Sequence, residues 1–331
     1  MFYINLPFGI LALFGILAFV PETVRDRTRT FDFFGFALLS LAIGALQMML
    51  DRGESQDWFA STEIIIETVL AALFFYMFLV HMFTADRPFI EPDLFKDRNF
   101  VVGLFLIFMV GIVLLATLAL LPPFLQNLMG FPVLTTGYVL APRGIGTMIA
   151  MLLVGRLVGK VDTRLLILFG IGLTVLPLWE MARFTTDVPV STIVWTGVTQ
   201  GLGLGFIFVP LSTVTFTTLA PQYRTEGAAM FSLMRNIGSS IGISIVITLL
   251  AQNTQVNHAS LAESMTPFRA MLQSPWLPQV WDWGTAAGVT ALNGEVTRQA
   301  ATIAYLNDFT LMMWAMLLSA PLLLLLRLRT R

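Results

Sequence analysis

Several polar side chains lie inside apolar runs that are long enough to cross a membrane, and their types define the chemistry open to this chain. Arg143 stands roughly eight residues into one such run, between Pro142 and Gly144. An arginine at the centre of a membrane helix costs about 2.5–3.5 kcal/mol on the insertion scale. We therefore predict that Arg143 faces a cavity or a partner. The alternative is snorkelling to the outer interface, about 12 Å away along the helix.

Carboxylates and a second cation occupy comparable positions. Glu63 and Glu67 are spaced i, i+4, so both lie on one helix face. Two carboxyl groups so placed can share a proton, and a carboxyl at membrane depth is a typical proton carrier. Glu67 is therefore a candidate proton site, with a solvated helix face as the alternative. Arg235 and Asn236 are candidates for a polar path, although Arg235 can instead pair with Glu226 or reach the inner interface.

Amide, aromatic and methionine side chains add to this set. Gln47 and Gln200 are expected to form hydrogen bonds between helices, and Gln200 is also a candidate for the polar path. Most of the aromatic residues should face lipid or neighbouring helices. A subset is suited to an apolar cavity that adapts to varied ligands, namely Phe206, Phe208, Phe231 and Met234.

Pairs of glycines four residues apart recur in the apolar runs and predict close helix packing. The pairs are Gly155 and Gly159, Gly201 and Gly205, and Gly238 and Gly242. The GLGLG run at 201–205 is not predicted to be a nucleotide loop, because no strand precedes it. The GSSIG run at 238–242 lacks the strand-to-helix elbow of a hydrolase nucleophile for the same reason.

A short basic turn joins two of the runs. It combines small residues at a helix end with one carboxylate and three cations, so we predict a charge-paired latch between helix ends on the cytoplasmic face. A positively charged inner turn without further function is the alternative. The residues concerned are Gly155, Arg156, Lys160, Asp162 and Arg164.

Composition places the chain in a membrane. Of its 331 residues, 56% are hydrophobic and 12% charged, with a mean hydropathy of +0.81, whereas soluble domains carry about 25% charged residues. The net charge of −1 argues against a nucleic-acid partner. The chain has no cysteine and two histidines, so we predict neither a metal site nor a cofactor. Since no catalytic cluster of histidine and carboxylates is evident, we predict that the chain is not an enzyme.

The expected fold is all-α: a polytopic bundle of about nine transmembrane helices, each about 20 residues long. The first run is treated as a span because it has no basic segment or cleavage site of a signal peptide. Thirteen Lys and Arg residues fall on one set of connections and four on the other, which predicts a cytoplasmic C-terminus and an outer N-terminus. The expected spans are 2–20, 33–50, 62–83, 100–124, 135–158, 164–181, 191–219, 228–251 and 307–326.

One long connection, at about 252–306, is expected on the outer side. It carries three tryptophans beside prolines, in the segment PWLPQVWDW at 275–283. Indole rings favour the membrane interface, so interfacial packing is one interpretation. A docking surface for an outside partner is the other.

Several short motifs occur along nearly the whole chain. They are FYINLPFG at 2–9, RPFIEPDLF at 87–95, APRGIG at 141–146, GRLVG at 155–159, FVPLS at 208–212, YRTEGA at 223–228 and LMRNIGSSIG at 233–242. Together and in this order they resemble the EmrB/QacA-type drug:proton antiporters of the major facilitator superfamily. The long outer connection before the last span looks more like the EmrB branch of that family.

The resemblance implies a domain organisation. Such transporters have fourteen spans, in two six-helix halves with an additional pair between them. Residues 1–22 would be the last helix of the N-terminal half, 23–99 the inserted pair with its linkers, and 100–331 the C-terminal half with its outer loop. The chain would then lack the first five spans, which explains the odd number of spans and the outer N-terminus.

The resemblance also implies a function: multidrug efflux, in which hydrophobic or amphipathic compounds leave in exchange for protons. It implies residence in a bacterial inner membrane and a possible periplasmic adaptor protein as partner. Asp162 is displaced from the family's usual place in the turn, so the latch is an open expectation. The alternative is a non-transporting membrane scaffold or partner subunit that docks through the outer loop.

Overall fold

The computed structural model describes residues 5–19, 31–266, 281–282 and 284–327, and within these ranges the regular structure is helical. The expectation of an all-α fold is therefore confirmed. The longer helices are α1 (Asn5–Phe19), α2 (Phe33–Arg52), α3 (Thr62–Thr84), α4 (Arg98–Pro123), α5 (Val133–Leu140), α6 (Pro142–Leu157), α7 (Thr163–Met181), α8 (Val190–Thr217), α9 (Arg224–Glu263) and α10 (Ala286–Ser319).

Eight segments of the described chain are long and apolar enough to cross a membrane. They correspond to the last eight of the nine expected spans, with α5 and α6 together forming one of them. The first expected span is represented by α1, an apolar helix of 15 residues, none of which is buried. The chain is thus a multi-pass membrane protein.

Local sequence chemistry sets the helix boundaries. The carboxylates of Asp32, Asp97 and Asp162 accept hydrogen bonds from the first-turn backbone N–H groups of α2, α4 and α7, which satisfies donors that the helix leaves unpaired. Pro142 is the first residue of α6 and separates it from α5. A proline tolerates this position because it has no N–H to pair. The break places Arg143 in the first turn of α6.

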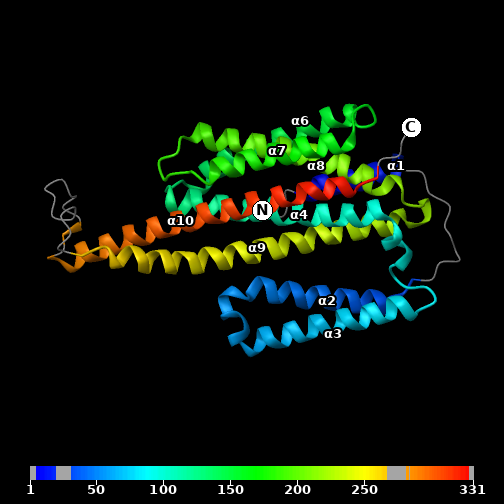
Figure 1. Cartoon of the computed structure of the whole chain (residues 1–331), viewed down its shortest axis with the longest axis horizontal. Helices are drawn as coiled ribbons and strands as arrows, with labels where there is room; N and C mark the ends of the chain where they lie inside the picture. The colour runs from blue at the N-terminus through cyan, green and yellow to red at the C-terminus, as the bar shows by residue number, and fades with distance from the viewer. Residues whose placement is uncertain (1–4, 20–30, 267–280, 283, 328–331) are drawn as a thin grey trace.

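The helices lie side by side along the long axis of the molecule (Figure 1). The α2–α3 pair forms one edge and contacts α9 through α2. The remaining spans form a bundle in which α4, α7, α8 and α10 contribute most of the buried core. Phe100, Phe124 and Phe309 are its largest fully buried side chains.

Glycines mark the closest crossings. A Cβ atom at Gly238 would overlap the carbonyl oxygen of Phe108 on α4, and one at Gly242 would meet Ile112. At the crossing of α6 and α8, a Cβ at Gly201 would overlap the carbonyl oxygen of Arg143, and one at Gly205 would meet Ala150. These four glycines therefore lie where backbones approach each other directly.

Gly155 and Gly159 behave differently from the other pairs. Neither would bring an added Cβ within 4 Å of a neighbour. Gly159 instead has a φ of +87°, a conformation that favours glycine. Gly155 therefore lies in the last turn of α6 with open space beside it, and Gly159 lies in the turn between α6 and α7. Neither marks a helix crossing.

The connection expected at 252–306 contains much more helix than the sequence suggested. α9 continues to Glu263 and α10 begins at Ala286, and Figure 1 shows the two helices extending together beyond the ends of their neighbours. Asn257 donates to the carbonyl oxygen of Ala300 at 3.4 Å, and His258 lies 3.0 Å from the side-chain oxygen of Asn293. Most of the tryptophan-rich segment at 275–283 lies outside the described residues.

Candidate functional site

Arg143 is a buried cation in the first turn of α6. Its side chain is 8% exposed, and neither terminal guanidinium nitrogen has a hydrogen-bond partner among the residues that the structure describes. It lies against α8, where Gly197 and Gly201 leave room for it. The hydroxyl of Thr147 donates to its carbonyl oxygen at 3.1 Å. Since buried cations are normally paired, these free donors suit an acceptor group of a ligand.

Gln200 lies on a different face of α8, toward α4. It is fully buried, and its Nε2 donates to the hydroxyl of Thr117 at 3.3 Å. Its carbonyl oxygen has no partner in the described part of the chain. A small cavity of about 10 Å³ beside Gln200 and Thr174 is close to the space that one water molecule needs. The expected hydrogen bond between helices is present here.

Gln47 also joins two helices. Its carbonyl oxygen accepts from the hydroxyl of Ser240 on α9 at 2.5 Å, and its amide nitrogen donates to Asp51 at 2.8 Å. It therefore ties the α2–α3 pair to α9 rather than contributing to the interior of the bundle.

Asp308 is a buried acidic residue that sequence reasoning missed. It lies on α10, is 0% exposed, and neither carboxyl oxygen has a hydrogen-bond partner among the described residues. Met312, one turn along the same face, contacts the hydroxyl of Thr117 at 3.6 Å. Asp308 thus lies one turn from the polar layer formed by Gln200 and Thr117. Asp308 is the second residue of the last expected span, at 307–326, and was therefore expected near the membrane surface. The sequence did not predict that α10 begins as early as Ala286.

The aromatic candidates occupy separate environments. Phe208 and Phe231 pack edge to face at 6.2 Å, and the guanidinium of Arg235 lies 5.8 Å from the ring of Phe208. Phe206 instead packs against Phe169 at 5.1 Å, between α7 and α8. Met234 faces the α2–α3 pair. The structure therefore brings Phe208, Phe231 and Arg235 together but does not place all four apolar candidates in one cavity.

Asn236 and Glu67 lie apart from these groups. Asn236 is exposed, next to Arg235 on α9. Glu67 is 7% exposed on the buried face of α3, with its Oε2 lacking a partner in the described chain. Glu63, one turn away, forms an ion pair with Arg52. The carboxyl of Glu63 is therefore engaged at the end of the α2–α3 pair rather than sharing a proton with Glu67.

The turn between α6 and α7 forms a different contact from the expected charge pair. The carboxylate of Asp162 accepts from the N–H of Arg164 at 2.8 Å and caps α7, while Arg156 and Lys160 are exposed. Arg164 donates to the carbonyl oxygen of Leu326. The link between helix ends is therefore a cation-to-carbonyl hydrogen bond that joins α7 to the end of the last span.

Two further hydrogen bonds strengthen this end of the bundle. The side chain of Asn99, which is 2% exposed, donates to the carbonyl oxygen of Arg327 at 2.8 Å and accepts from its N–H at 2.7 Å. Asp97 accepts from the hydroxyl of Thr218 at 2.9 Å. The starts of α4 and α7 are thus tied to the chain that follows α10 and to the end of α8.

These features define a class of protein: a multi-pass helical bundle with unpaired polar groups buried between its spans, as expected where a membrane protein binds or moves polar species. Comparison with known sequences identifies the family. The Major Facilitator Superfamily profile matches residues 1–243. The chain belongs to this superfamily.

Named relatives refine the comparison. The multidrug export protein EmrB of Escherichia coli K12 is 34% identical over 276 residues, which are 83% of this chain and 54% of that protein. The fatty acid resistance protein FarB of Neisseria gonorrhoeae is 32% identical over 307 residues, 92% of this chain and 60% of that protein. The chain therefore spans somewhat more than half the length of these relatives.

Among solved structures, a bacterial homologue of the human lysosomal transporter Spinster aligns with 88% of this chain and 65% of its own. The sequence identity is 14% and the TM-score is 0.48.

Proposed function

We propose that this chain forms part of a proton-coupled multidrug exporter, which moves hydrophobic or amphipathic compounds out of a bacterial cell across the inner membrane. Membership of the superfamily and the export and resistance functions named for its relatives support this proposal. In alternating access, two halves rock around a site near the membrane midplane. We assign residues 100–331 to one such half, 23–99 to an inserted pair with its linkers, and 1–22 to a helix of the other half.

The observation that carries the proposal is the burial of Asp308 without a hydrogen-bond partner among the residues that the structure describes. An ionised carboxylate in an apolar interior carries a large solvation cost, so such a group is held as the neutral acid or is reached by water. A buried carboxyl can lose its proton when water reaches it and regain the proton when the helices close around it again. Such a group couples proton movement to a change in helix packing. We assign this role to Asp308.

Arg143 and the aromatic group around Phe208 are assigned to substrate contact. The unpaired guanidinium supplies hydrogen-bond donors, and the rings of Phe208 and Phe231 supply apolar surface. A mainly apolar surface with few polar groups favours binding of many different amphipathic compounds rather than a single specific substrate. Glu67 and the Arg164 contact at the end of α7 are further candidates, for a proton site and a latch respectively.

A second candidate function rests on the paired extensions of α9 and α10. They project beyond the neighbouring helices (Figure 1), and we assign this projection to the binding of a periplasmic adaptor protein. In this assignment the C-terminus lies on the cytoplasmic side, as the distribution of Lys and Arg predicts. The same surface would serve a scaffold that docks a partner without transporting anything. Deleting 255–300 separates the two: a transporter loses the adaptor but still binds drugs, whereas a scaffold loses its partner and binds no drug in either form.

The experiment that tests export expresses the whole exporter, of which this chain is proposed to form part, in a bacterial strain lacking its major drug pumps. We expect active extrusion of an amphipathic cationic dye, and we expect a protonophore to abolish it. Export that persists after the proton gradient has collapsed would contradict proton coupling. Absence of export from cells that hold correctly inserted protein would contradict the transport function itself.

A further inference from the structure

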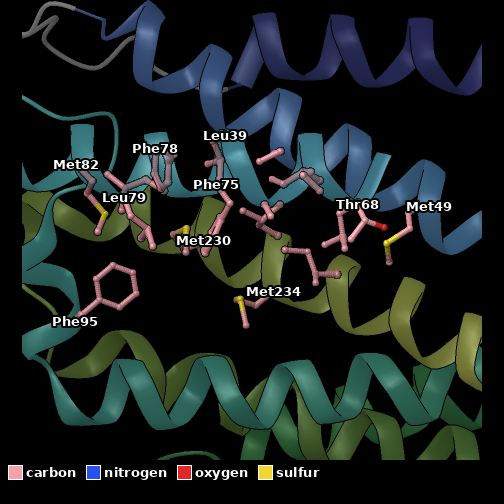
Figure 2. A pocket seen from close by; sticks show the side chains of 18 residues that line it. Leu39, Met49, Thr68, Phe75, Phe78, Leu79, Met82, Phe95, Met230 and Met234 are labelled. Carbon is pink, nitrogen blue, oxygen red and sulfur yellow. The ribbon is translucent and has the colours of Figure 1, made fainter. Parts of the chain in front are cut away.

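A large apolar pocket separates the α2–α3 pair from α9. Its volume is about 720 Å³. Figure 2 shows side chains from both sides of the gap, with Phe75, Phe78 and Leu79 of α3 facing Met230 and Met234 of α9. The two sides are joined elsewhere, by the bond between Gln47 and Ser240 and by the linker before α4. The middle of the interface between them is therefore left open.

The lining determines what can fill this pocket. Among the described residues that line it, Thr68 provides the single polar side chain, and that hydroxyl already donates to the carbonyl oxygen of Ile64 at 2.7 Å. A water molecule in the pocket would find almost no hydrogen-bond partners, and apolar cavities of this kind do not hold ordered water. Protein interiors also tolerate few voids of this size. The filling is therefore expected to be apolar, as the acyl chain of a lipid is.

The shape of the pocket suits a chain that runs along the membrane normal. Thr68 and Met82 lie near opposite ends of it in Figure 2, and about 21 Å of helix rise separates them on α3. The hydrocarbon core of a bilayer is about 30 Å thick. The pocket thus extends across more than one leaflet, parallel to the spans, in the direction that lipid acyl chains already take.

One end of the pocket lies beside a charged linker at the end of a span, where lipid headgroups are expected. Phe95 lies there, and it belongs to the polar linker that joins α3 to α4. Residues 86–98 of this linker contain four carboxylates and three cations. This near-balance of the two signs matches a headgroup that carries one charge of each sign better than a purely anionic one.

We propose that the pocket between α2, α3 and α9 binds an acyl chain of a zwitterionic glycerophospholipid, whose headgroup lies beside the linker at 86–98. The lipid acts as a packing element that holds the α2–α3 pair against α9. This proposal does not depend on the transport function, since it rests on the pocket and on the charges of the adjoining linker.

A filling substitution tests the proposal. Ala72 lines the pocket, and Ala37 lies exposed on α2 outside it. The intact protein, purified in mild detergent from membranes that contain phosphatidylethanolamine and phosphatidylglycerol, is examined by native mass spectrometry. We expect the wild type and Ala37→Trp to retain phosphatidylethanolamine, and Ala72→Trp to lose it. Equal retention in Ala72→Trp, or no retained lipid in the wild type, would overturn the proposal.

Two further measurements cover the remaining outcomes. Recovery of single-chain amphiphiles or of phosphatidylglycerol alone would refute the assignment to a zwitterionic phospholipid. If Ala72→Trp does not fold, a phosphatidylethanolamine with a photoreactive group in its acyl chain is applied to the wild type. We expect crosslinks to peptides containing 71–79 and 230–237. Crosslinks only to outward-facing parts of α2 and α3 would contradict the site.

Discussion

The burial of Arg143 predicts that this residue lowers the stability of the folded protein, although we assign it a role in substrate contact. On the insertion scale, arginine at a helix centre costs about 2.5–3.5 kcal/mol and leucine gains about 0.3–0.6 kcal/mol. Because the terminal guanidinium nitrogens of Arg143 have no hydrogen-bond partner in the described part of the chain, Arg143→Leu removes a solvation cost without leaving such a partner unpaired. The smaller side chain leaves some unfilled volume, which offsets part of the gain. We expect a net stabilisation of about 1–3 kcal/mol.

The assay compares unfolding of the intact protein and its variants in one detergent. Arg156→Leu is the matched control, since Arg156 is exposed near the end of the same helix; its effect should stay within about 0.5 kcal/mol. We also expect Arg143→Leu to weaken binding of ligands that carry a hydrogen-bond acceptor, and Arg143→Lys to restore part of it. A loss of stability in Arg143→Leu of about 1 kcal/mol or more would refute the reasoning, because it would mean that Arg143 has a structural partner.

Two other predictions concern the frame that holds these residues. Gly238→Ala should destabilise the protein by about 1–3 kcal/mol, because its Cβ would overlap the backbone of α4. Gly155→Ala has open space around its Cβ and should be neutral or slightly stabilising. Similar melting temperatures for the two variants would contradict the packing at this crossing. Burial of Asp32 acts to raise the pKa of its carboxyl, but hydrogen bonds from Gly35, His81 and Phe89 outweigh this effect and lower it below 3.8. The stability contributed by Asp32 is therefore complete well above pH 3.8 and is lost as the pH falls through the lowered pKa; the stability difference between wild type and Asp32→Asn should shrink over this acidic range, and a constant difference would contradict the assignment.

The sequence predicted the fold class well because membrane spans depend on long apolar runs. The last eight expected spans all correspond to helices, whereas the cavity or partner predicted for Arg143 stays a prediction. Glycine spacing also indicated where backbones meet, at Gly201 and Gly238. These inferences rest on local composition, which a single sequence contains in full.

The relation between side chains on different helices was harder to predict. Phe206 and Phe208 are two residues apart, so on a helix they point in different directions and pack against different neighbours. Asp308 was missed because helix α10 begins long before its apolar part, and only the neighbouring helices show that this residue is buried. The pocket beside α9 depends on how the α2–α3 pair packs against α9. The hydrophobic periodicity of the sequence does not determine that packing.

The central claim is that Asp308 carries the proton that drives export. The most direct measurement is drug transport by the intact protein in liposomes under an imposed pH gradient, with Asp308→Asn compared with the exposed control Asp93→Asn. Since neither oxygen of Asp308 has a bond to lose among the described residues, we expect Asp308→Asn to fold and to bind drug. We expect it to have lost transport driven by the pH gradient, while Asp93→Asn retains it. Full gradient-driven transport by Asp308→Asn would contradict the account.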